Sequence, residues 1–567
     1  MRFSILRRMI VFMTIVAMLA SFAACGGKGN NEPAASTVAA ESSAPASTVP
    51  EEVVDPLGKY DPAIEISSCI AIGPDCIFAE GEDINNNTWT RNYEADLGIK
   101  LKYDWTADGS QFGQKLNMVI ASNDMPDFFV AGPEQIKMLT DSEQIWDLTP
   151  IYEKWASEDT KGYLTQDPIG FKSAHVDGKM MGLPLVDSSA ASASLLWIRN
   201  DWLKNLNLQV PTNMQEVLAV AKAFATQDPD KNGKNDTFGL GANKDLWTAF
   251  SSLSGFFNSY HAYVGNSSFW LKDAGGQIVS GNNLPETRIA LLALQGMFKD
   301  GLIDKEFGVK DNVKVAEDTA SGKIGMQFGA WWNPDWPLNA NKQKDPKADW
   351  LAYPIVSSDD KPALHGYGNY VSSYIVVNKD YEHPEAVVKM MNYWWNVIKN
   401  MSMENAQKYI FNVADPASNQ VYYKYINIIG WEPNGKANSY MKVQDALKTG
   451  DTSKLGLEEL EVIKYLDMYN KGDNAGWTAY TEMGPQGSYA AIIKVIEGAG
   501  LCSVFYGAST PVMAEKMPAL TKMQNEVFTN IILGEPIENF DKFVTDWKKL
   551  GGDEITKEVN DWYAKNY

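Results

Sequence analysis

From residue 60 onward, short apolar runs alternate with amphipathic stretches, a pattern typical of an α/β protein. Ala63–Ile72 is apolar and β-branched, which predicts a first strand. The next segments predict a helix, a strand, a second helix and a third strand, in this order: Arg91–Leu97, Gly98–Leu101, Gln111–Ser122 and Met125–Val130. Such an order predicts a parallel sheet with crossover helices, whose ligands bind beyond the carboxyl ends of the strands.

The rest of the chain continues this alternation before helices take over. Leu195–Arg199 predicts a strand, and a helix is expected to start at Asn200. Thr212 and Gln215 have the spacing of a capping box, which predicts another helix start. Further strands are predicted from Gly325, over Trp350–Val356 and over Tyr374–Val377, and the last three helices over Met513–Leu533, Phe540–Leu550 and Ile555–Tyr563.

The apolar run Met9–Ala24 follows a basic start and is too short to span a bilayer, which indicates a secretory signal over residues 1–24. Its end, Phe22-Ala23-Ala24-Cys25, resembles the lipobox of bacterial lipoproteins. This resemblance implies cleavage before Cys25 and acyl chains on its sulfur. The alternatives are an ordinary signal peptide with a chance cysteine, and a twin-arginine route through Arg7 and Arg8.

A lipid on Cys25 would hold the mature chain on the outer side of the cell membrane, as expected in a Gram-positive-type bacterium. Two or more acyl chains anchor stably, whereas one binds only marginally. Residues 25–59 hold the cysteine and a segment of Gly, Asn, Ala, Ser, Thr, Pro and Glu, which predicts a flexible tether. As a random coil the tether would reach about 30–35 Å. No later segment is long and apolar enough to cross the membrane.

Composition narrows the possible partners. The 567 residues carry a formal charge of −21, and the predicted signal contains three arginines and no acidic residue. The mature chain is therefore more negative still, and anionic lipid heads and nucleic acids should repel it, so a nucleic-acid partner is excluded. With 45% hydrophobic and 11% aromatic residues the chain is expected to fold, into two or more lobes.

The chain has four cysteines and four histidines, too few and too scattered for a disulfide framework or a zinc site. Besides Cys25 these cysteines are Cys69, Cys76 and Cys502. Cys69 and Cys76 either pair across a turn or remain buried free thiols.

Residues 228–236 match the first part of an EF-hand calcium loop. Oxygen side chains at loop positions 1, 3, 5 and 9, a glycine at position 6 and a main-chain carbonyl at position 7 are the ligands of a hard cation. The predicted ligands are Asp228, Asp230, Asn232, Lys234 through its carbonyl, and Asp236. Position 12 is Gly239 where the loop normally has a bidentate Glu, so water, Thr237 or a distant group must complete the site. The alternative is a polar turn without metal.

Several motifs recur in a fixed order: the lipobox, the tether, Met125-Pro-Asp127, Gly182-Leu-Pro184, Ile198–Leu203, the 228–236 loop and the closing segment 505–563. Together they resemble an extracellular solute-binding lipoprotein of family 1, in the long oligosaccharide-binding branch that carries a calcium loop. The resemblance implies a capture subunit of an ABC importer, without enzymatic activity and monomeric, which delivers its solute to the permease subunits.

The fold implied by the resemblance is the α/β, type II periplasmic-binding-protein-like fold, with two lobes joined by crossing strands at a hinge. We expect the first lobe over residues 60–188 and 372–400 and the second over 189–371 and 401–567. The crossings are expected near Leu183–Leu196, Tyr367–Ile375 and Trp395–Asn405. Closure would be a hinge motion around the ligand.

Eighteen tryptophans favour a carbohydrate ligand, because an indole covers the apolar face of a sugar ring while polar neighbours bind its hydroxyls. The candidate ligand-binding residues are Trp331, Trp332, Trp89, Phe129, Asp187, Trp197, Asn333, Tyr367, Tyr370, Trp431 and Tyr506. Trp331 and Trp332 stand out, since neighbours on one strand point in opposite directions and cannot both face inward. For any other single tryptophan the alternative is the core, and we assign to packing Trp202, Trp247, Trp394, Trp547 and Trp562.

Two other functions remain open. A binder of peptides or aminosugars would have the same fold with charged groups in place of stacked rings. A surface-attached carbohydrate hydrolase would need two carboxylates about 5–9.5 Å apart, and among 71 acidic residues such a pair can occur anywhere. The order of motifs favours a binding protein over an enzyme.

Overall fold

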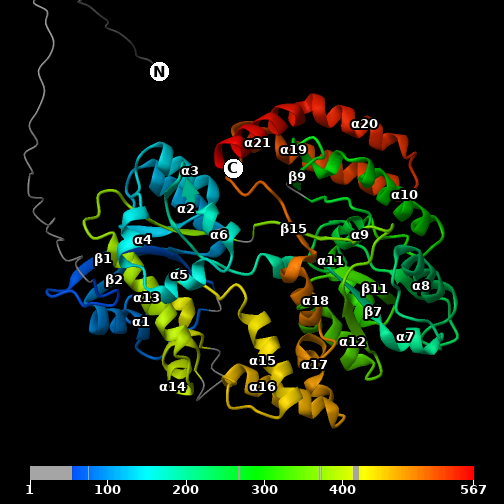
Figure 1. The fold of residues 1–567 in the computed structure, drawn as a ribbon, viewed down its shortest axis with the longest axis horizontal. Helices are drawn as coiled ribbons and strands as arrows, with labels where there is room; N and C mark the ends of the chain where they lie inside the picture. Colours follow the sequence, from blue (N-terminus) through cyan, green and yellow to red (C-terminus); the bar gives the residue numbers. More distant parts are fainter. Residues whose placement is uncertain (1–53, 74–75, 266–268, 370, 372, 413–419) are drawn as a thin grey trace, which may run out of the picture. The chain divides into compact units, whose positions relative to one another are not determined.

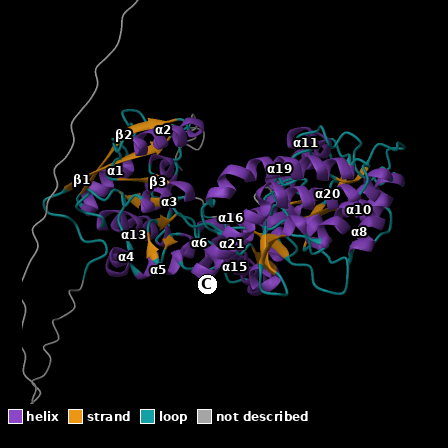
Figure 2. Ribbon diagram, turned by 90° about the horizontal axis from the view of Figure 1, so that it is seen from above, coloured by secondary structure: helices purple, strands orange, loops and turns teal. Residues whose placement is uncertain are grey.

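The computed structural model describes residues 54–73, 76–265, 269–369, 371, 373–412 and 420–567 (Figures 1 and 2). The predicted signal, Cys25 and Tyr370 lie outside this part of the chain. Two large hydrophobic cores and a smaller third one organise the described residues. We call the part built on the first core the first lobe, and the part built on the other two the second lobe.

The first lobe takes its elements from two separate stretches of sequence. The first stretch contains β1 (Ile64–Ala71), α1 (Thr88–Asn92), β2 (Ile99–Ala107), α2 (Gly109–Ala121), β3 (Phe128–Ala131), α3 (Pro133–Asp141), α4 (Thr149–Trp155), α5 (Glu158–Leu164), α6 (Pro168–Ser173), β4 (His175–Val176), β5 (Lys179–Met180) and β6 (Leu183–Pro184). The second contains β14 (Tyr374–Val377), α13 (Glu385–Lys399) and α14 (Met403–Asn405).

Strands β1 and β2 pair in parallel, as predicted, whereas β14 lies between β3 and β6 and is antiparallel to both. The two sheets are joined by hydrogen bonds between β1 and the start of β3. The backbone and hydroxyl of Ser67 donate to the Asp127 carboxylate at 2.7 and 2.9 Å, and the Ser68 hydroxyl donates to the Phe128 carbonyl at 2.9 Å. Taken together, these strands of the first lobe form a mixed arrangement, because β14 enters between β3 and β6 after the chain has returned from the second lobe.

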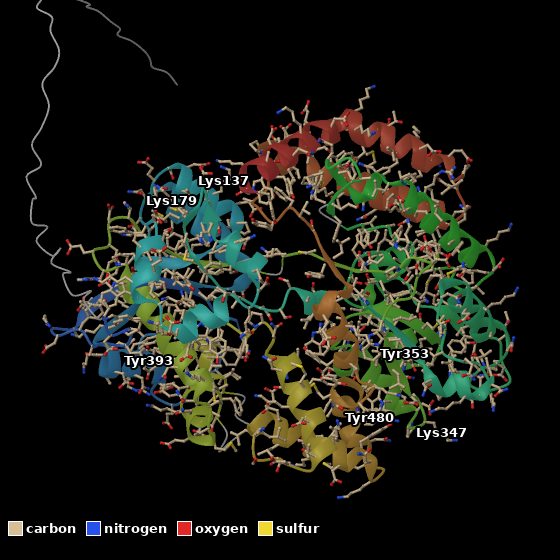
Figure 3. All side chains as sticks on the ribbon, viewed as in Figure 1. Lys137, Lys179, Lys347, Tyr353, Tyr393 and Tyr480 are labelled. Carbon is tan, nitrogen blue, oxygen red and sulfur yellow. The ribbon has the colours of Figure 1, made fainter. Side chains whose placement is uncertain are left out.

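Helix α13 is buried along most of its length and carries the aromatic centre of the first lobe. Trp394 stacks on Trp89 with ring centroids 5.5 Å apart. The Tyr393 hydroxyl (Figure 3) bonds to Asp96 at 2.6 Å and to the Tyr409 hydroxyl at 2.8 Å. We expected residues 401–567 in the second lobe, but the first core also contains Tyr409, Ile410, Tyr425, Ile426 and Ile428.

The start of the described chain is bound to the same helix. Lys389 donates from Nζ to the Gly58 carbonyl at 2.6 Å, and Asn392 donates to the Pro56 carbonyl at 2.9 Å. The Lys389 ammonium also lies 4.3 Å from the centre of the Tyr60 ring. Residues 56–59, which we expected in the tether, are thus attached to the first lobe.

The second lobe begins with a four-stranded sheet and its surrounding helices. These elements are β7 (Leu195–Arg199), α7 (Asn200–Asn205), α8 (Met214–Thr226), β8 (Phe238–Leu240), α9 (Ser254–Ser259), β9 (Trp270–Lys272), β10 (Ile278–Ser280), α10 (Pro285–Lys299), α11 (Asn312–Ala320), β11 (Ile324–Gly329), α12 (Asn339–Lys344), β12 (Trp350–Tyr353) and β13 (His365–Tyr367). The strand order is β12-β7-β11-β8, and only β11 and β8 are parallel.

The central strand β7 is apolar from Leu195 to Ile198 because both of its faces are buried. Leu195 and Trp197 belong to the third core, whereas Leu196 and Ile198 belong to the second. This is the two-residue alternation of a strand between two layers. Arg199 ends the strand fully buried, and its guanidinium bonds to Asp201 at 2.8 and 2.6 Å.

From Gly435 onward the chain is mostly helical and covers the second lobe (Figure 1). Helices α15 and α18 pack on the third core, and α19 packs against α10 and α20 in the second. The three predicted C-terminal helices are confirmed as α19, α20 and α21. The elements are α15 (Gly435–Thr449), α16 (Leu457–Asn470), α17 (Trp477–Met483), α18 (Ser488–Lys494), β15 (Gly500–Cys502), α19 (Pro511–Ile532), α20 (Glu538–Trp547) and α21 (Asp553–Asn566).

The chain passes between the lobes three times. It leaves the first core after Val186 and enters the third at Leu195, and it returns between His365 and Val371. These two passages lie where we expected them. The third lies between Ile428 and Ala437 rather than near residues 395–405, because α13 continues into the first core.

The helix start near residue 212 differs from the prediction by one residue. Asn213 is the N-cap of α8, and its side chain accepts the Glu216 backbone N–H at 2.9 Å. The Glu216 carboxylate in turn accepts the Thr212 backbone N–H at 2.7 Å and its hydroxyl at 2.9 Å. Asparagine caps helices as well as threonine does, so Thr212 and Gln215 alone could not fix the start.

Candidate solute-binding site

A cavity of about 580 Å³ is lined by loops of the second lobe, by the start of α3 and by the returning segment. Its volume lies in the range of small-molecule binding sites. The residues that line it are Pro133, Glu134, Ser192, Ser194, Trp247–Ala249, Ser252, Ser254, Asn258, Val264, Gly265, Phe269, Trp270, Gly329, Ala330, Gly366–Asn369, Val371, Ser503, Phe505–Gly507, Ser509 and Met513.

Two buried polar groups in this wall have no protein partner within the described part of the chain. They are the Ser194 hydroxyl and the indole N–H of Trp270. Leaving such a group unsatisfied costs about 1–3 kcal/mol, so it normally bonds to water or to a ligand. The more accessible polar side chains of the wall, such as Ser192, Ser254 and Asn369, are neutral as well, which suits ligand hydroxyls better than ligand charges.

Aromatic rings stand beside these groups. Trp247 is half-buried in the cavity wall, and its N–H donates to Asn525 at 2.8 Å, which fixes the ring. Tyr506 lies edge-on to Trp562, with centroids 4.8 Å apart. Flat apolar faces beside neutral donors are the two features that a sugar ring needs from its site.

Tyr367 and Tyr506, both predicted from the sequence, line this cavity. Burial raises the pKa of both phenols, so both remain neutral hydrogen-bonding groups at physiological pH. Tyr367 also belongs to β13, which pairs in parallel with β15. This pairing joins the segment that returns to the first lobe to the segment that precedes α19. Both segments line the cavity.

A second group of predicted residues lies outside the cavity. Trp331 and Trp332 are half-buried after β11, and the Trp331 ring lies 4.9 Å from that of Tyr489. Asp187 is close enough to Tyr489 to contribute to its raised pKa, and burial raises the pKa of Asp187 itself. Trp431, 41% exposed, bonds through its backbone N–H to the Val186 carbonyl at 3.1 Å. These four residues thus lie near the chain passages between the lobes.

Four of the predicted ligand-binding residues are buried in the protein, so we correct their assignment. Trp89 and Trp197 donate their indole N–H groups to the carbonyls of Tyr409 and Ala330, at 3.0 and 3.1 Å. Phe129 lies fully buried on β3. The Asn333 side chain accepts from Gln327 and donates to the Ala249 carbonyl, both at 3.2 Å, and so supports the wall of the cavity from behind.

Sequence reasoning missed Ser194, Trp270 and Asn258, and it assigned Trp247 to packing. The only sequence feature that pointed to Ser194 is the run of small residues from Ser188 to Ser194, just before β7. The assignment of Trp202, Trp394 and Trp547 to packing is confirmed, since all three are buried.

The predicted calcium loop keeps its oxygen side chains together. The Asp228 carboxylate accepts the backbone N–H groups of Asn232 and Gly233, each at 3.0 Å. The Asn232 amide donates to Asp230 at 2.8 Å and to Asp236 at 3.2 Å. Burial and the neighbouring Asp228 carboxylate raise the pKa of Asp230, as expected where acidic groups converge without a counter-charge.

The far end of the loop offers no further side chain. The Thr237 hydroxyl donates to the Phe224 carbonyl at 2.7 Å, and a Cβ on Gly239 would come within 2.3 Å of the Ala221 carbonyl oxygen. Over the described ranges no three His, Cys, Asp or Glu side chains form a metal-binding group. The donor set of two or three carboxylates, one amide and main-chain oxygens fits a hard cation only with water as the remaining ligand.

Within the described residues, Cys69, Cys76 and Cys502 form no disulfide, so the pairing of Cys69 with Cys76 is not observed. In the portion of the chain that the structure covers, no helix has the length and apolar character needed to cross a membrane.

Two α/β lobes joined by three chain passages, with a cavity of rings and neutral hydrogen-bonding groups, define a solute-binding protein of the type II fold. The chain belongs to the bacterial extracellular solute-binding proteins, whose family model matches residues 79–395, more than half of its length. The family expected from the motifs is thereby confirmed.

Two curated relatives extend this assignment. The polygalacturonan/rhamnogalacturonan-binding protein YtcQ of Bacillus subtilis (strain 168) is 25% identical over 395 residues, 70% of this chain and 72% of YtcQ. Lipoprotein LipO of the same strain is 22% identical over 497 residues, 83% of this chain and 88% of LipO.

Solved structures confirm the fold. A solute-binding protein associated with an HMO-binding ABC transporter of Bifidobacterium longum infantis ATCC 15697 has a TM-score of 0.63 at 18% identity and covers 89% of this chain and 99% of its own. An EF-hand mutant of FusA from S. pneumoniae, in complex with fructo-nystose, has a TM-score of 0.54 at 15% identity and covers 88% and 99%.

Proposed function

We propose that this protein is a lipid-anchored, monomeric capture subunit that binds an oligosaccharide in the 580 Å³ cavity and delivers it to the permease of an ABC importer. The observation that carries the proposal is the pairing of half-buried aromatic rings with neutral polar side chains in one cavity wall. Relatives named for binding polygalacturonan or fructooligosaccharide support a carbohydrate as the solute.

We propose binding without turnover. Hydrolysis of a glycosidic bond requires two carboxyl groups on either side of the bond. Glu134 is the only acidic residue among the described residues that line the cavity, and its carboxylate accepts the Ser509 hydroxyl at 3.1 Å. A peptide ligand would also find few charged partners for its termini in this wall.

Isothermal titration of the chelator-treated and calcium-loaded protein with a panel of defined oligosaccharides tests the proposal. Trp247→Ala is expected to weaken the best ligand at least tenfold, because one stacked ring contributes about 0.5–1.5 kcal/mol beyond its buried area. Trp336→Ala is the matched control, since Trp336 is 39% exposed and does not line the cavity. Unchanged affinity in Trp247→Ala, or release of cleaved product, would refute the proposal.

Trp331→Ala and Trp332→Ala test whether the ligand also reaches the second group of rings. We expect each to weaken a long oligosaccharide more than tenfold and a short one little. Equal effects on both lengths would place these rings within the same subsite as Trp247.

We propose further that the 228–236 loop holds one Ca²⁺ through Asp228, Asp230, Asn232, the Lys234 carbonyl and Asp236. The bound ion would neutralise the converging carboxylates and fix the turn between α8 and β8. A relative described as an EF-hand mutant supports such a loop in this family. Calorimetric titration of calcium into chelator-treated protein should give a binding isotherm that Asp230→Asn weakens, and the absence of heat in the unmodified protein would exclude the site.

The anchor and the delivery step are the remaining parts of the proposal. Metabolic labelling with a fatty acid should mark the protein, and Cys25→Ser should abolish the label and release the protein into the medium. Small-angle scattering with and without the best ligand should show a smaller radius of gyration on binding, as expected for hinge closure.

A further inference from the structure

The end of α21 contacts the first lobe, although the helix itself packs in the second. Ile555 and Val559 of this helix are fully buried in the second core. Farther along the helix, the Lys565 ammonium forms an ion pair with the carboxylate of Asp177, which lies in the turn between β4 and β5. The two lobes are therefore held together by side chains as well as by the three chain passages.

An aromatic contact extends this attachment. The Lys172 ammonium on α6 lies 5.4 Å from the centre of the Tyr567 ring. Tyr567 stacks on Tyr563 with ring centroids 4.5 Å apart, which holds its ring in place. The negative face of an aromatic ring attracts such a cation. Lys172 and Asp177 of the first lobe thus meet Tyr567 and Lys565 of the second, and we call these four residues the interlobe contact.

The interlobe contact adjoins the wall of the 580 Å³ cavity. The ring of Tyr567 lies 6.3 Å from that of Tyr506, which lines this cavity. Trp562 contacts both rings, at 4.8 Å from Tyr506 and 6.5 Å from Tyr567. The backbone beside Tyr506 also lies close to this indole, since a Cβ on Gly507 would come within 2.7 Å of the Trp562 ring nitrogen. The position of Tyr506 therefore depends on the rings at the end of α21.

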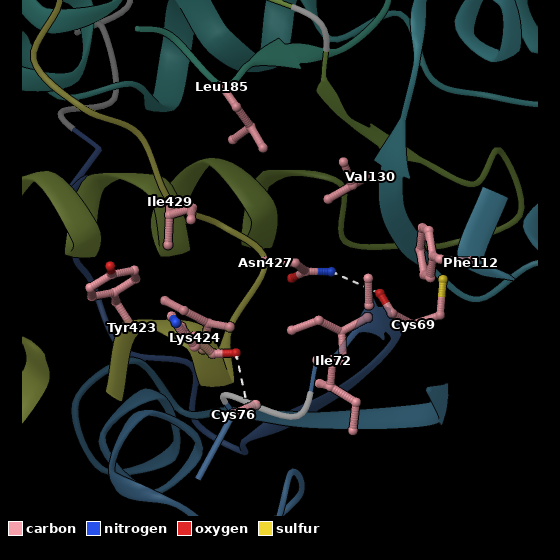
Figure 4. A pocket seen from close by; sticks show the side chains of 14 residues that line it. Cys69, Ile72, Cys76, Phe112, Val130, Leu185, Tyr423, Lys424, Asn427 and Ile429 are labelled. Atoms are coloured by element: carbon pink, nitrogen blue, oxygen red, sulfur yellow. Dashed lines mark hydrogen bonds between the residues drawn. The ribbon is translucent and has the colours of Figure 1, made fainter. Parts of the chain in front are cut away.

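The interlobe contact does not itself line a cavity. Its four residues belong neither to the wall of the 580 Å³ cavity nor to that of a second one, of about 400 Å³, in the first lobe. Figure 4 shows Leu185, Val130 and Ile429 in the wall of that second cavity. The side chains of Lys565 and Asp177 are 64% and 62% exposed. Substitution of either residue should therefore leave both cavities and the fold intact.

We propose that the interlobe contact stabilises the arrangement of the lobes seen here against opening of the hinge, and that Tyr567 thereby acts as a positioning residue for Tyr506. The first part is independent of any ligand, whereas the second rests on the function proposed above. A contact made in only one of two arrangements shifts their equilibrium by its own free energy. Each of these exposed contacts should change the ratio of the two arrangements by roughly two- to fivefold.

Small-angle scattering of the ligand-free protein tests the first part. Lys565→Glu places two carboxylates opposite each other and should raise the radius of gyration. Asp177→Asn removes one charge with a residue that tolerates the left-handed backbone at this position, where φ is 53°. In the double variant Lys565→Glu should add no further increase, since it has no carboxylate to repel. In 1 M salt, which screens charges beyond about 3 Å, these proteins and the unmodified one should have the same radius.

Lys471→Glu is the matched control. Lys471 is 73% exposed and pairs with Asp467 of α16, four residues earlier, so its ion pair lies within one lobe. The control should keep the radius of the unmodified protein. An unchanged radius in Lys565→Glu, an equal increase in Lys471→Glu, or additive increases in the double variant would overturn the proposal.

Isothermal titration with kestose and with a galacturonic acid trisaccharide tests the second part. Tyr567→Leu should weaken binding about fivefold, and Tyr567→Phe, which keeps a ring beside Lys172 and Tyr506, should retain most of the affinity. Full affinity in Tyr567→Leu, or equal losses in both variants, would overturn the positioning role. Failure of both oligosaccharides to bind the unmodified protein would count against the proposed function and against the positioning role with it, while the scattering result still decides the interlobe contact.

Discussion

Glu482 on α17 is a carboxyl group whose stability effect follows from its surroundings. One of its oxygens is buried and has no hydrogen-bond partner in the described chain. Burial, together with the neighbouring Asp335 carboxylate, raises the pKa of Glu482 from the usual 4.5 to about 8. The side chain is therefore neutral in the folded protein at pH 7, whereas it ionises freely in the unfolded chain.

The sign and size of the effect follow from proton linkage. Between pH 4.5 and 8 the folded state binds the proton more tightly than the unfolded state, so stability falls as the pH rises through this window. Each pH unit above the unfolded-state pKa costs about 1.4 kcal/mol, which gives on the order of 3 kcal/mol at pH 7. Above pH 8 the penalty stops growing.

The variant Glu482→Gln keeps the shape of the neutral acid and cannot ionise in either state. We expect it to match the unmodified protein near pH 4.5 and to be more stable by on the order of 3 kcal/mol at pH 7. Urea unfolding at several pH values measures the difference, in which all other titrating groups cancel. The exposed Glu461→Gln is the control. A stability difference that stays constant from pH 5 to 8 would refute the reasoning.

Three further predictions concern buried charged or titratable groups. Burial lowers the pKa of His365 to about 4, so stability should fall by up to roughly 3 kcal/mol as the pH drops from 6.5 to 4; His365→Gln should lack this loss in acid unfolding curves. Arg199→Met should lower the free energy of unfolding by about 3–5 kcal/mol, because it leaves the carboxylate of Asp201 unpaired. Thermal unfolding measures this loss, and an unchanged midpoint would contradict the prediction. Lys389→Met should release the segment around Gly58, so limited proteolysis should cleave there faster while the body stays intact.

Many of the helices and strands were predictable from the sequence because their apolar periodicities are strong, whereas the two-lobe fold was expected from the family resemblance. The first strand and the C-terminal helices lie where their patterns placed them. The order of strands in the sheets was not predictable, because it depends on β14, which returns from the second lobe. The apolar periodicity of a strand or helix shows which of its sides is buried. It does not show which other strand or helix packs against that side.

The candidate site was predictable only in part. Tyr367 and Tyr506 line the cavity, yet Trp197 is in the core and Trp247, assigned to packing, is in the wall. Buried and ligand-facing tryptophans have the same composition and similar flanking residues. The difference arises from both faces of β7 being covered, which only the tertiary arrangement reveals.

The division of the first lobe between two distant stretches of sequence has a consequence for biosynthesis. Cys76 bonds to Lys424, 348 positions later, and β3 has no partner on one edge until β14 has been made. A nascent chain that emerges amino terminus first therefore carries an unpaired strand and an open core through most of translation. If the proposed signal directs export of the unfolded chain, folding outside the cell would avoid that exposure within the cytoplasm.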